Sequence, residues 1–179
     1  MINTLILAAS ILSFDPFLML KPMPDEDRAI YIQLWEKSTG SAIHYIDVRF
    51  LETSKFSGLA CSSSRVLINK TRWDLSTDER KEALMMHEFG HTYGLRHDAT
   101  LVRVLERDAV TTSSQEATHS YIPMSIMTNE DRITSKDWRT FKRYYFAELR
   151  LKLKYHRDPT LVSSSSMICD RYIYEDLTK

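Results

Sequence analysis

The chain has 179 residues, a length that suits one domain with short appendages. Hydrophobic residues make up 43% of it, which is enough to bury a real core. Its 24 basic residues are balanced by 24 acidic ones, whereas nucleic-acid binders normally present a basic face. The composition therefore indicates a globular protein and argues against a dedicated nucleic-acid binder.

The N-terminal segment from Met1 to Phe14 is apolar but too short to span a bilayer comfortably. It is similar to the apolar region of a secretory signal, although no Lys or Arg precedes the apolar run. We expect residues 1–20 to be a signal-like segment of a secreted or extracytoplasmic protein. A buried strand or helix in a cytoplasmic protein is the alternative. Residues 21–27, with two prolines, are expected to be a polar linker.

The next part of the chain predicts one helix and three strands. Apolar residues spaced among charges predict a helix over 25–36. Alternating apolar and polar residues predict a strand over 43–51. Two shorter strands are expected over 56–61 and 65–69, separated by the turn-forming serines of 62–64.

A longer helix follows. Ser76 and Glu79 have the spacing of a capping box, and the helix is expected to run to about Tyr93. Gly90 lies in its interior, where glycine costs up to about 1 kcal/mol relative to alanine, so a close packing contact is expected there. One side of the helix is apolar, through Ala83, Met86, Phe89 and Tyr93.

The most informative stretch runs from His87 to Asp98 and reads H-E-x-x-H-x-x-G-x-x-H-D. His87 and His91 are four residues apart on one helix face, so both imidazoles can reach one ion. Glu88 projects beside this pair, a position that suits a general base acting on water.

A catalytic zinc ion usually has three protein ligands and one open position. His97 is the candidate third ligand, but it would face away from the other two if the helix continued. Gly94 answers this problem, because glycine adopts a left-handed conformation at low cost and can turn the chain back. The spacing therefore predicts one catalytic Zn²⁺ held by His87, His91 and His97.

This extended motif resembles that of the metzincin metallopeptidases. Their second hallmark is a methionine in a tight turn beneath the metal, and Met127 matches it better than Met124 does. The resemblance implies an α+β fold, with a twisted mixed sheet packed on a central active-site helix and a further helix after the Met-turn. It also implies that residues 21–179 form one catalytic domain, in which the segment 56–61 is the sheet edge that pairs with an extended peptide.

Two positions bear on the subfamily, which stays open. Asp98 resembles the adamalysin pattern, and we expect it to orient local backbone or a ligand, with a solvated loop aspartate as the alternative. Asn129 stands where astacins and serralysins carry a tyrosine, so a tyrosine ligand from the turn is not expected. By the same resemblance, the polar segment 129–134 would form the wall of the pocket after the scissile bond.

The remaining chain predicts one clear helix. Thr134 can cap it, with Asp137 at its third position, and its apolar stripe comprises Trp138, Phe141, Tyr145 and Leu149. The alternation over 149–155 suits either a strand or a continuation of this helix. Before the turn, 101–108 is expected to be a short helix and 111–120 a polar loop that includes His119. From Ser163 onward the chain is a serine-rich tail.

Cys61 and Cys169 do not have the spacing of metal ligands. In an exported protein they would form one disulfide that ties the C-terminal tail to the body. Two reduced cysteines are the alternative.

Together these patterns predict a zinc-dependent endopeptidase that hydrolyses peptide bonds by metal-activated water, with Glu88 as general base. Its partner is a polypeptide substrate, with no nucleic acid and no stable membrane span. A gluzincin-type peptidase is one alternative, with Glu106 or Glu116 replacing His97 as third ligand. The other is a zinc-stabilised binding domain that cleaves nothing. The intact Glu88 argues against it, because a structural zinc site has no use for a general base.

Overall fold

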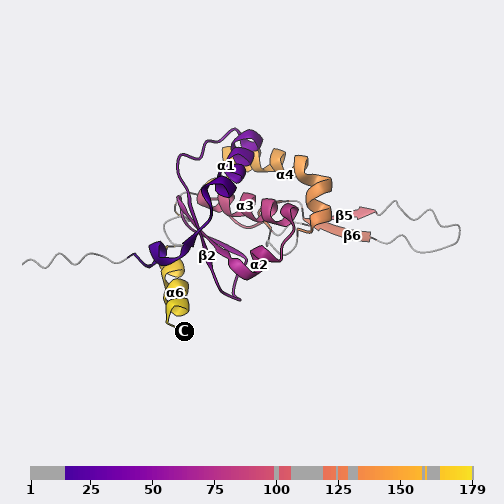
Figure 1. The fold of residues 1–179 in the computed structure, drawn as a ribbon. Helices are drawn as coiled ribbons and strands as arrows, with labels where there is room; N and C mark the ends of the chain where they lie inside the picture. Colours follow the sequence, from indigo (N-terminus) through magenta and orange to yellow (C-terminus); the bar gives the residue numbers. More distant parts are fainter. Residues whose placement is uncertain are drawn as a thin grey trace, which may run out of the picture.

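A computed structural model describes residues 15–98, 101–105, 119–123, 125–128, 133–158, 160 and 166–178. The fold is α+β, with a four-stranded mixed sheet, helices, and a separate two-stranded ribbon (Figure 1). The apolar segment expected to be signal-like, Met1 to Phe14, lies outside the described residues. Within the described part of the chain, no helix has the length and apolar character needed to cross a membrane.

The sheet has the order β1-β2-β4-β3. Strands β2 and β4 run parallel, while β1 and β3 are antiparallel to their neighbours. Strand β3 is therefore an edge of the sheet, as the resemblance implied for 56–61. The strands are β1 (Lys21–Pro22), β2 (Asp47–Leu51), β3 (Gly58–Ser62) and β4 (Arg65–Asn69).

Two predictions for this region were wrong in part. The strand expected over 43–51 begins only at Asp47, because its register with β4 starts at the pair of Asp47 and Arg65. The expected linker over 21–27 instead supplies strand β1, which pairs with β2, and then the first turn of helix α1. Met23 anchors this passage because its side chain is buried.

The chain also forms helices α1 (Asp25–Thr39), α2 (Lys70–Asp74), α3 (Asp78–Thr92) and α4 (Ser135–Tyr155). The N-cap of α3 is Thr77 rather than Ser76, because the Thr77 hydroxyl accepts from the Arg80 N–H at 3.4 Å. The Ser76 hydroxyl instead donates to the carbonyl of Arg72 at 2.7 Å, at the end of α2.

Helix α4 begins with the capping box that the sequence predicted. The Thr134 hydroxyl accepts from the Asp137 N–H, and the Asp137 carboxylate accepts from the Thr134 N–H, both at 3.1 Å. The helix continues to Tyr155, so the alternating segment 149–155 is helical.

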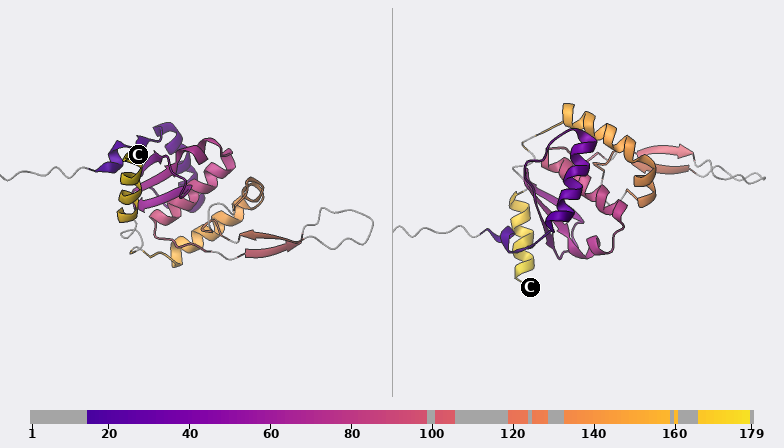
Figure 2. Two further views of the ribbon diagram at one scale, coloured as in Figure 1. Left: turned by 90° about the horizontal axis from the view of Figure 1, so that it is seen from below. Right: turned by 45° about the horizontal axis from the view of Figure 1, so that its top comes forward.

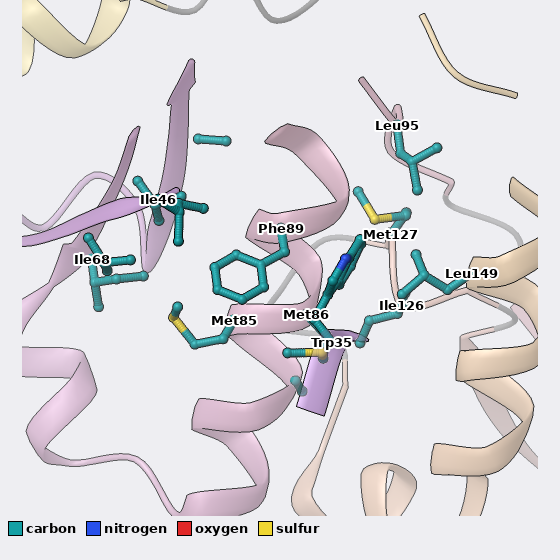
Figure 3. Close-up of a cluster of buried hydrophobic side chains, with 14 of the residues drawn as sticks. Trp35, Ile46, Ile68, Met85, Met86, Phe89, Leu95, Ile126, Met127 and Leu149 are labelled. Atoms are coloured by element: carbon teal, nitrogen blue, oxygen red, sulfur yellow. The ribbon is translucent and has the colours of Figure 1, made fainter. Parts of the chain in front are cut away.

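The main core lies between the sheet, α3, α1 and α4. Figure 3 shows Phe89 of α3 directed toward Ile46 and Ile68 on the sheet side. The apolar sides expected for α3 and α4 are confirmed: the buried members include Ala83, Met86, Phe89, Trp138, Tyr145 and Leu149, and Tyr93 and Phe141 pack against them partly buried. Burial of one side of α3 leaves its histidine-bearing side for the candidate site.

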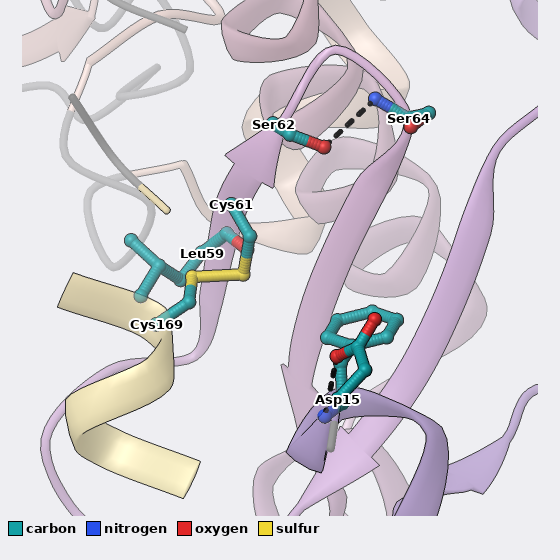
Figure 4. Close-up of a disulfide and its surroundings, with 7 residues drawn as sticks. Asp15, Leu59, Cys61, Ser62, Ser64 and Cys169 are labelled. Carbon is teal, nitrogen blue, oxygen red and sulfur yellow. Dashed lines mark hydrogen bonds between the residues drawn. A yellow bond between two sulfur atoms is a disulfide. The ribbon is translucent and has the colours of Figure 1, made fainter. Parts of the chain in front are cut away.

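A second, smaller core covers the opposite face of the sheet. It joins the short 3-10 helix η1 (Pro16–Met19) and helix α6 (Ser166–Leu177) to outward-facing sheet residues. The predicted disulfide between Cys61 of β3 and Cys169 of α6 is confirmed (Figure 4), and Figure 2 shows α6 beside the sheet, away from α4. The serine-rich tail is therefore largely a docked helix.

The described residues before the Met-turn form a two-stranded antiparallel ribbon. Strand β5 (Leu101–Leu105) pairs with β6 (His119–Pro123), so the helix expected over 101–108 was wrong at 101–105, and His119 lies in a strand. Residues 106–118, which include most of the expected polar loop, lie outside the described residues. The β-branched Val102 and Val104 favour this pairing. The partner strand is too distant in sequence for a local periodicity to reveal it.

Candidate metal centre

The three histidines of the motif come together at the C-terminal end of α3. His87 and His91 lie one helical turn apart, and α3 ends at Thr92. Gly94 then adopts a φ of 80°, in the left-handed region, and the chain turns back to bring His97 to the other two rings. A Cβ at Gly94 would also lie 2.4 Å from the carbonyl oxygen of Asp158, so neither the conformation nor the space admits a larger residue.

The three Nε2 atoms form a triangle that suits one metal ion. Those of His87 and His91 are 3.0 Å apart, those of His91 and His97 are 3.0 Å apart, and those of His87 and His97 are 3.2 Å apart. Nitrogen ligands of a single tetrahedral zinc ion are separated by about 3.4 Å. The donor set therefore fits a zinc-sized ion with only a small adjustment.

Backbone carbonyls orient two of the rings. The Nδ1–H of His87 donates to Ile126 O at 2.8 Å, and the Nδ1–H of His91 donates to Leu95 O at 2.7 Å. A carbonyl only accepts, so each Nδ1 carries the proton and each neutral ring presents the Nε2 lone pair. Burial lowers the pKa of His87 well below its usual range, the pKa of His91 to about 4, and the pKa of His97 as well. Neutral imidazoles are the form that binds metal.

Glu88, next to His87 on α3, lies against the edge strand β3. Its side chain is only 2% exposed. A Cβ at Gly58 would lie 2.6 Å from Glu88 Oε1, so the strand approaches this carboxylate closely enough that only glycine fits. The candidate general base thus stands where the metal centre meets the edge of the sheet.

The Met-turn candidate packs directly on α3, the helix that carries His87 and His91. The Met127 N–H donates to Ser125 Oγ at 3.0 Å within the turn, and Met127 is fully buried. A Cβ at Gly90 would lie 2.4 Å from Met127 Sδ, which is the close packing contact expected from the glycine in mid-helix. The same turn supplies the Ile126 carbonyl that orients His87, so packing and ligand orientation come from one segment.

Asp98 is held by the turn and by α4. Its N–H donates to Met127 O at 2.7 Å, and Lys152 Nζ lies 2.6 Å from its Oδ2. Lys152 Nζ also lies 2.9 Å from Glu148 Oε1. This ion-pair network, comprising Asp98, Lys152 and Glu148, links α4 to the residue that follows the third histidine, and the Asp98 N–H joins it to the Met-turn.

Sequence reasoning missed Lys152 and Glu148. Their spacing of four residues signals an ion pair on a helix surface. Only the fold brings that pair to Asp98, which is 54 residues away from Lys152 in the chain.

Comparison with known proteins finds no match for this chain, whether to a family model, to a curated protein or to a solved structure. The alternative third ligands Glu106 and Glu116 lie outside the described residues, as do Met124 and Asn129. What can be inferred about function therefore depends on the geometry of the residues described above.

Proposed function

We propose that the chain is a zinc-dependent endopeptidase of metzincin type, with His87, His91 and His97 as metal ligands and Glu88 as general base. The convergence of three Nε2 atoms beside a buried carboxylate carries this proposal. Imidazole ligands suit zinc, and three protein ligands with one open position are typical of a catalytic site. His97 lies close enough to the other two rings to make a downstream glutamate ligand unnecessary.

A zinc ion held by His87, His91 and His97 would lower the pKa of a water molecule and would polarise the carbonyl of the scissile bond. Glu88 takes the proton from the water as it attacks that carbonyl, and later delivers the proton to the leaving amine. Glu88 lies against Gly58, which supports a proton transfer beside β3, where an extended peptide could add to the edge of the sheet.

The disulfide supports the location that the N-terminal segment suggested. Disulfides persist in oxidising compartments and are rare in the cytosol. Cys61 and Cys169 are bonded in this structure, which favours a secreted or extracytoplasmic enzyme.

The test pairs metal analysis with digestion of casein, for the wild type, Glu88→Gln and Glu88→Ala. We expect all three proteins to bind about one zinc per chain and only the wild type to cleave. Glu26→Gln, at an exposed carboxylate on α1, is the matched control and should retain activity. His97→Ala should lose most of its zinc affinity.

The outcomes separate the alternatives. Absence of zinc under metal-replete conditions would contradict the metal site itself. Zinc binding without cleavage of casein or of a peptide library by the wild type would favour a non-catalytic zinc domain. Full zinc affinity in His97→Ala would favour a different third ligand.

A further inference from the structure

An open cavity of about 580 Å³ lies along the N-terminal half of α3, the helix that carries His87 and His91. Its walls come from the segment before β3, from α2, from the N-terminal half of α3 and from the start of α4. The lining residues that matter here are Ser57, Arg72, Arg80, Leu84 and Ser135. We propose that this cavity binds an acidic side chain of the peptide substrate close to the scissile bond. This inference rests on the proposed peptidase function and adds a substrate class to it.

The position of the cavity links it to the peptide path. Ser57 directly precedes Gly58, the residue whose backbone lies against Glu88. Leu84 is three residues before His87 on α3, which is less than one helical turn. A peptide that pairs with β3 and crosses the metal centre therefore passes the mouth of this cavity at the Ser57 end of the strand.

The distance between Arg80 and His87 along α3 determines which substrate residue can reach Arg80. Arg80 is seven residues before His87, or about 10 Å along the helix axis. An extended peptide advances about 3.3 Å per residue. The acidic residue should therefore lie within about three residues of the scissile bond.

The charge of the cavity favours a carboxylate. Arg72 and Arg80 both line it, and among the lining residues that the structure describes none is acidic. The Arg72 guanidinium donates to Ser57 Oγ at 2.7 Å, which fixes it at the strand end of the cavity. Both arginines also make other contacts in the protein, and it is their positive charge at the cavity wall that selects an anion.

An acidic residue should be preferred over its uncharged isostere. Hydrogen bonds from arginine to a carboxylate are about twice as strong as those between neutral groups. The hydroxyls of Ser57 and Ser135 would accept or donate equally well to an amide. We therefore expect a preference of about tenfold in kcat/KM for Glu over Gln at one substrate position.

The experiment uses fluorogenic peptides that differ only in having Glu, Gln or Lys at one of the three positions on either side of the scissile bond. For the zinc-loaded wild type, Glu should exceed Gln by about tenfold at one position, and the ratio should fall as salt is raised. Arg80→Gln should abolish the preference, and Arg80→Glu should invert it in favour of Lys. Arg150→Gln is the control, since this exposed arginine lies about 22 Å along α4 from Ser135.

Arg72 has a second role, because it anchors the segment before β3, so Arg80 is the cleaner position for substitution. Equal cleavage of the Glu and Gln peptides by the wild type at every position would overturn the proposal. A Glu preference that survives in both Arg80→Gln and Arg72→Gln would also overturn it.

A binding measurement separates this inference from the proposed function. Fluorescence anisotropy reports the affinity of the same peptides for zinc-loaded Glu88→Gln protein, with and without Arg80→Gln. Tighter binding of the Glu peptide that depends on Arg80 supports the cavity even if the wild type cleaves no peptide, in which case only the peptidase function fails. Equal binding of the Glu and Gln peptides contradicts the cavity assignment.

Discussion

The ion-pair network behind the third histidine predicts a measurable contribution from Lys152. Its side chain is 17% exposed and its ammonium contacts Asp98 and Glu148. Lys152→Met keeps the apolar stem but leaves two carboxylates facing each other. Breaking a buried ion pair costs about 3–5 kcal/mol. Asp98 is 33% exposed, so water screens part of its charge, and burial raises the pKa of Glu148. We therefore expect a smaller loss in the free energy of unfolding, about 2–3 kcal/mol.

The same substitution should weaken metal binding. Asp98 directly follows His97, and loss of a partner that orients a ligand typically costs about 10–100-fold in metal affinity. We expect about a tenfold loss of zinc affinity in Lys152→Met, measured by competition with a chromophoric chelator. Urea unfolding of the zinc-free protein gives the stability change in parallel. Lys154→Met, at an exposed lysine of the same helix, is the control and should change neither quantity.

A double variant separates stability from positioning. Adding Glu148→Gln to Lys152→Met removes the excess negative charge, so most of the stability should return. Zinc affinity should stay low, because Asp98 still lacks its cationic partner. Zinc affinity within twofold of the wild type in the Lys152→Met variant would refute the idea that α4 positions the third ligand.

Three further predictions concern the contacts around the site. Gly90→Ala should lower the free energy of unfolding in urea by about 1–2 kcal/mol, because the clash with Met127 costs more than the gain of about 1 kcal/mol in helix propensity. A variant more stable than the wild type would contradict the close contact between Gly90 and Met127. The bond between Cys61 and Cys169 spans 108 residues, so its reduction should cost about 5 kcal/mol in thermal or urea unfolding. With the disulfide reduced and the protein still folded, zinc affinity should be unchanged, because α6 packs on the sheet face opposite α3. Loss of zinc from the folded, reduced protein would contradict this. In the folded, zinc-free protein the pKa of His91 is lowered to about 4, against 6.5 for an ordinary histidine. Between pH 4 and pH 6.5 the unfolded chain therefore binds more protons than the folded one, so the free energy of unfolding falls as the pH falls. We expect about 2 kcal/mol less stability at pH 5 than at pH 7, and a smaller loss in His91→Gln.

The candidate metal centre could be anticipated from sequence because its parts are local. His87 and His91 are related by the helical period, and one left-handed glycine, Gly94, is enough to return His97 to them. The pairing of the disulfide could also be anticipated, because two cysteines permit only one intramolecular pairing, whereas the sequence left open whether they are oxidised. Rules that act within a few residues, or that leave a single choice, carry over directly from sequence to structure.

The errors arose where a hydrogen-bond partner outside the predicted element decides the outcome. The 101–108 segment was assigned to a helix because its partner strand, residues 119–123, lies beyond an intervening stretch of chain. The N-cap moved from Ser76 to Thr77 because the Ser76 hydroxyl donates to Arg72 O at the end of the preceding helix.

Contacts from several parts of the fold hold the candidate ligands in place. The carbonyls of Leu95 and Ile126 orient two rings from separate loops, and each loop is fixed by packing in the main core. The Met-turn and α4 add the ion-pair network around Asp98, and β3 presses against Glu88. The histidines of the motif can therefore be read from the sequence, while the contacts that hold them in place involve residues far away in the chain, such as Lys152 and Gly58.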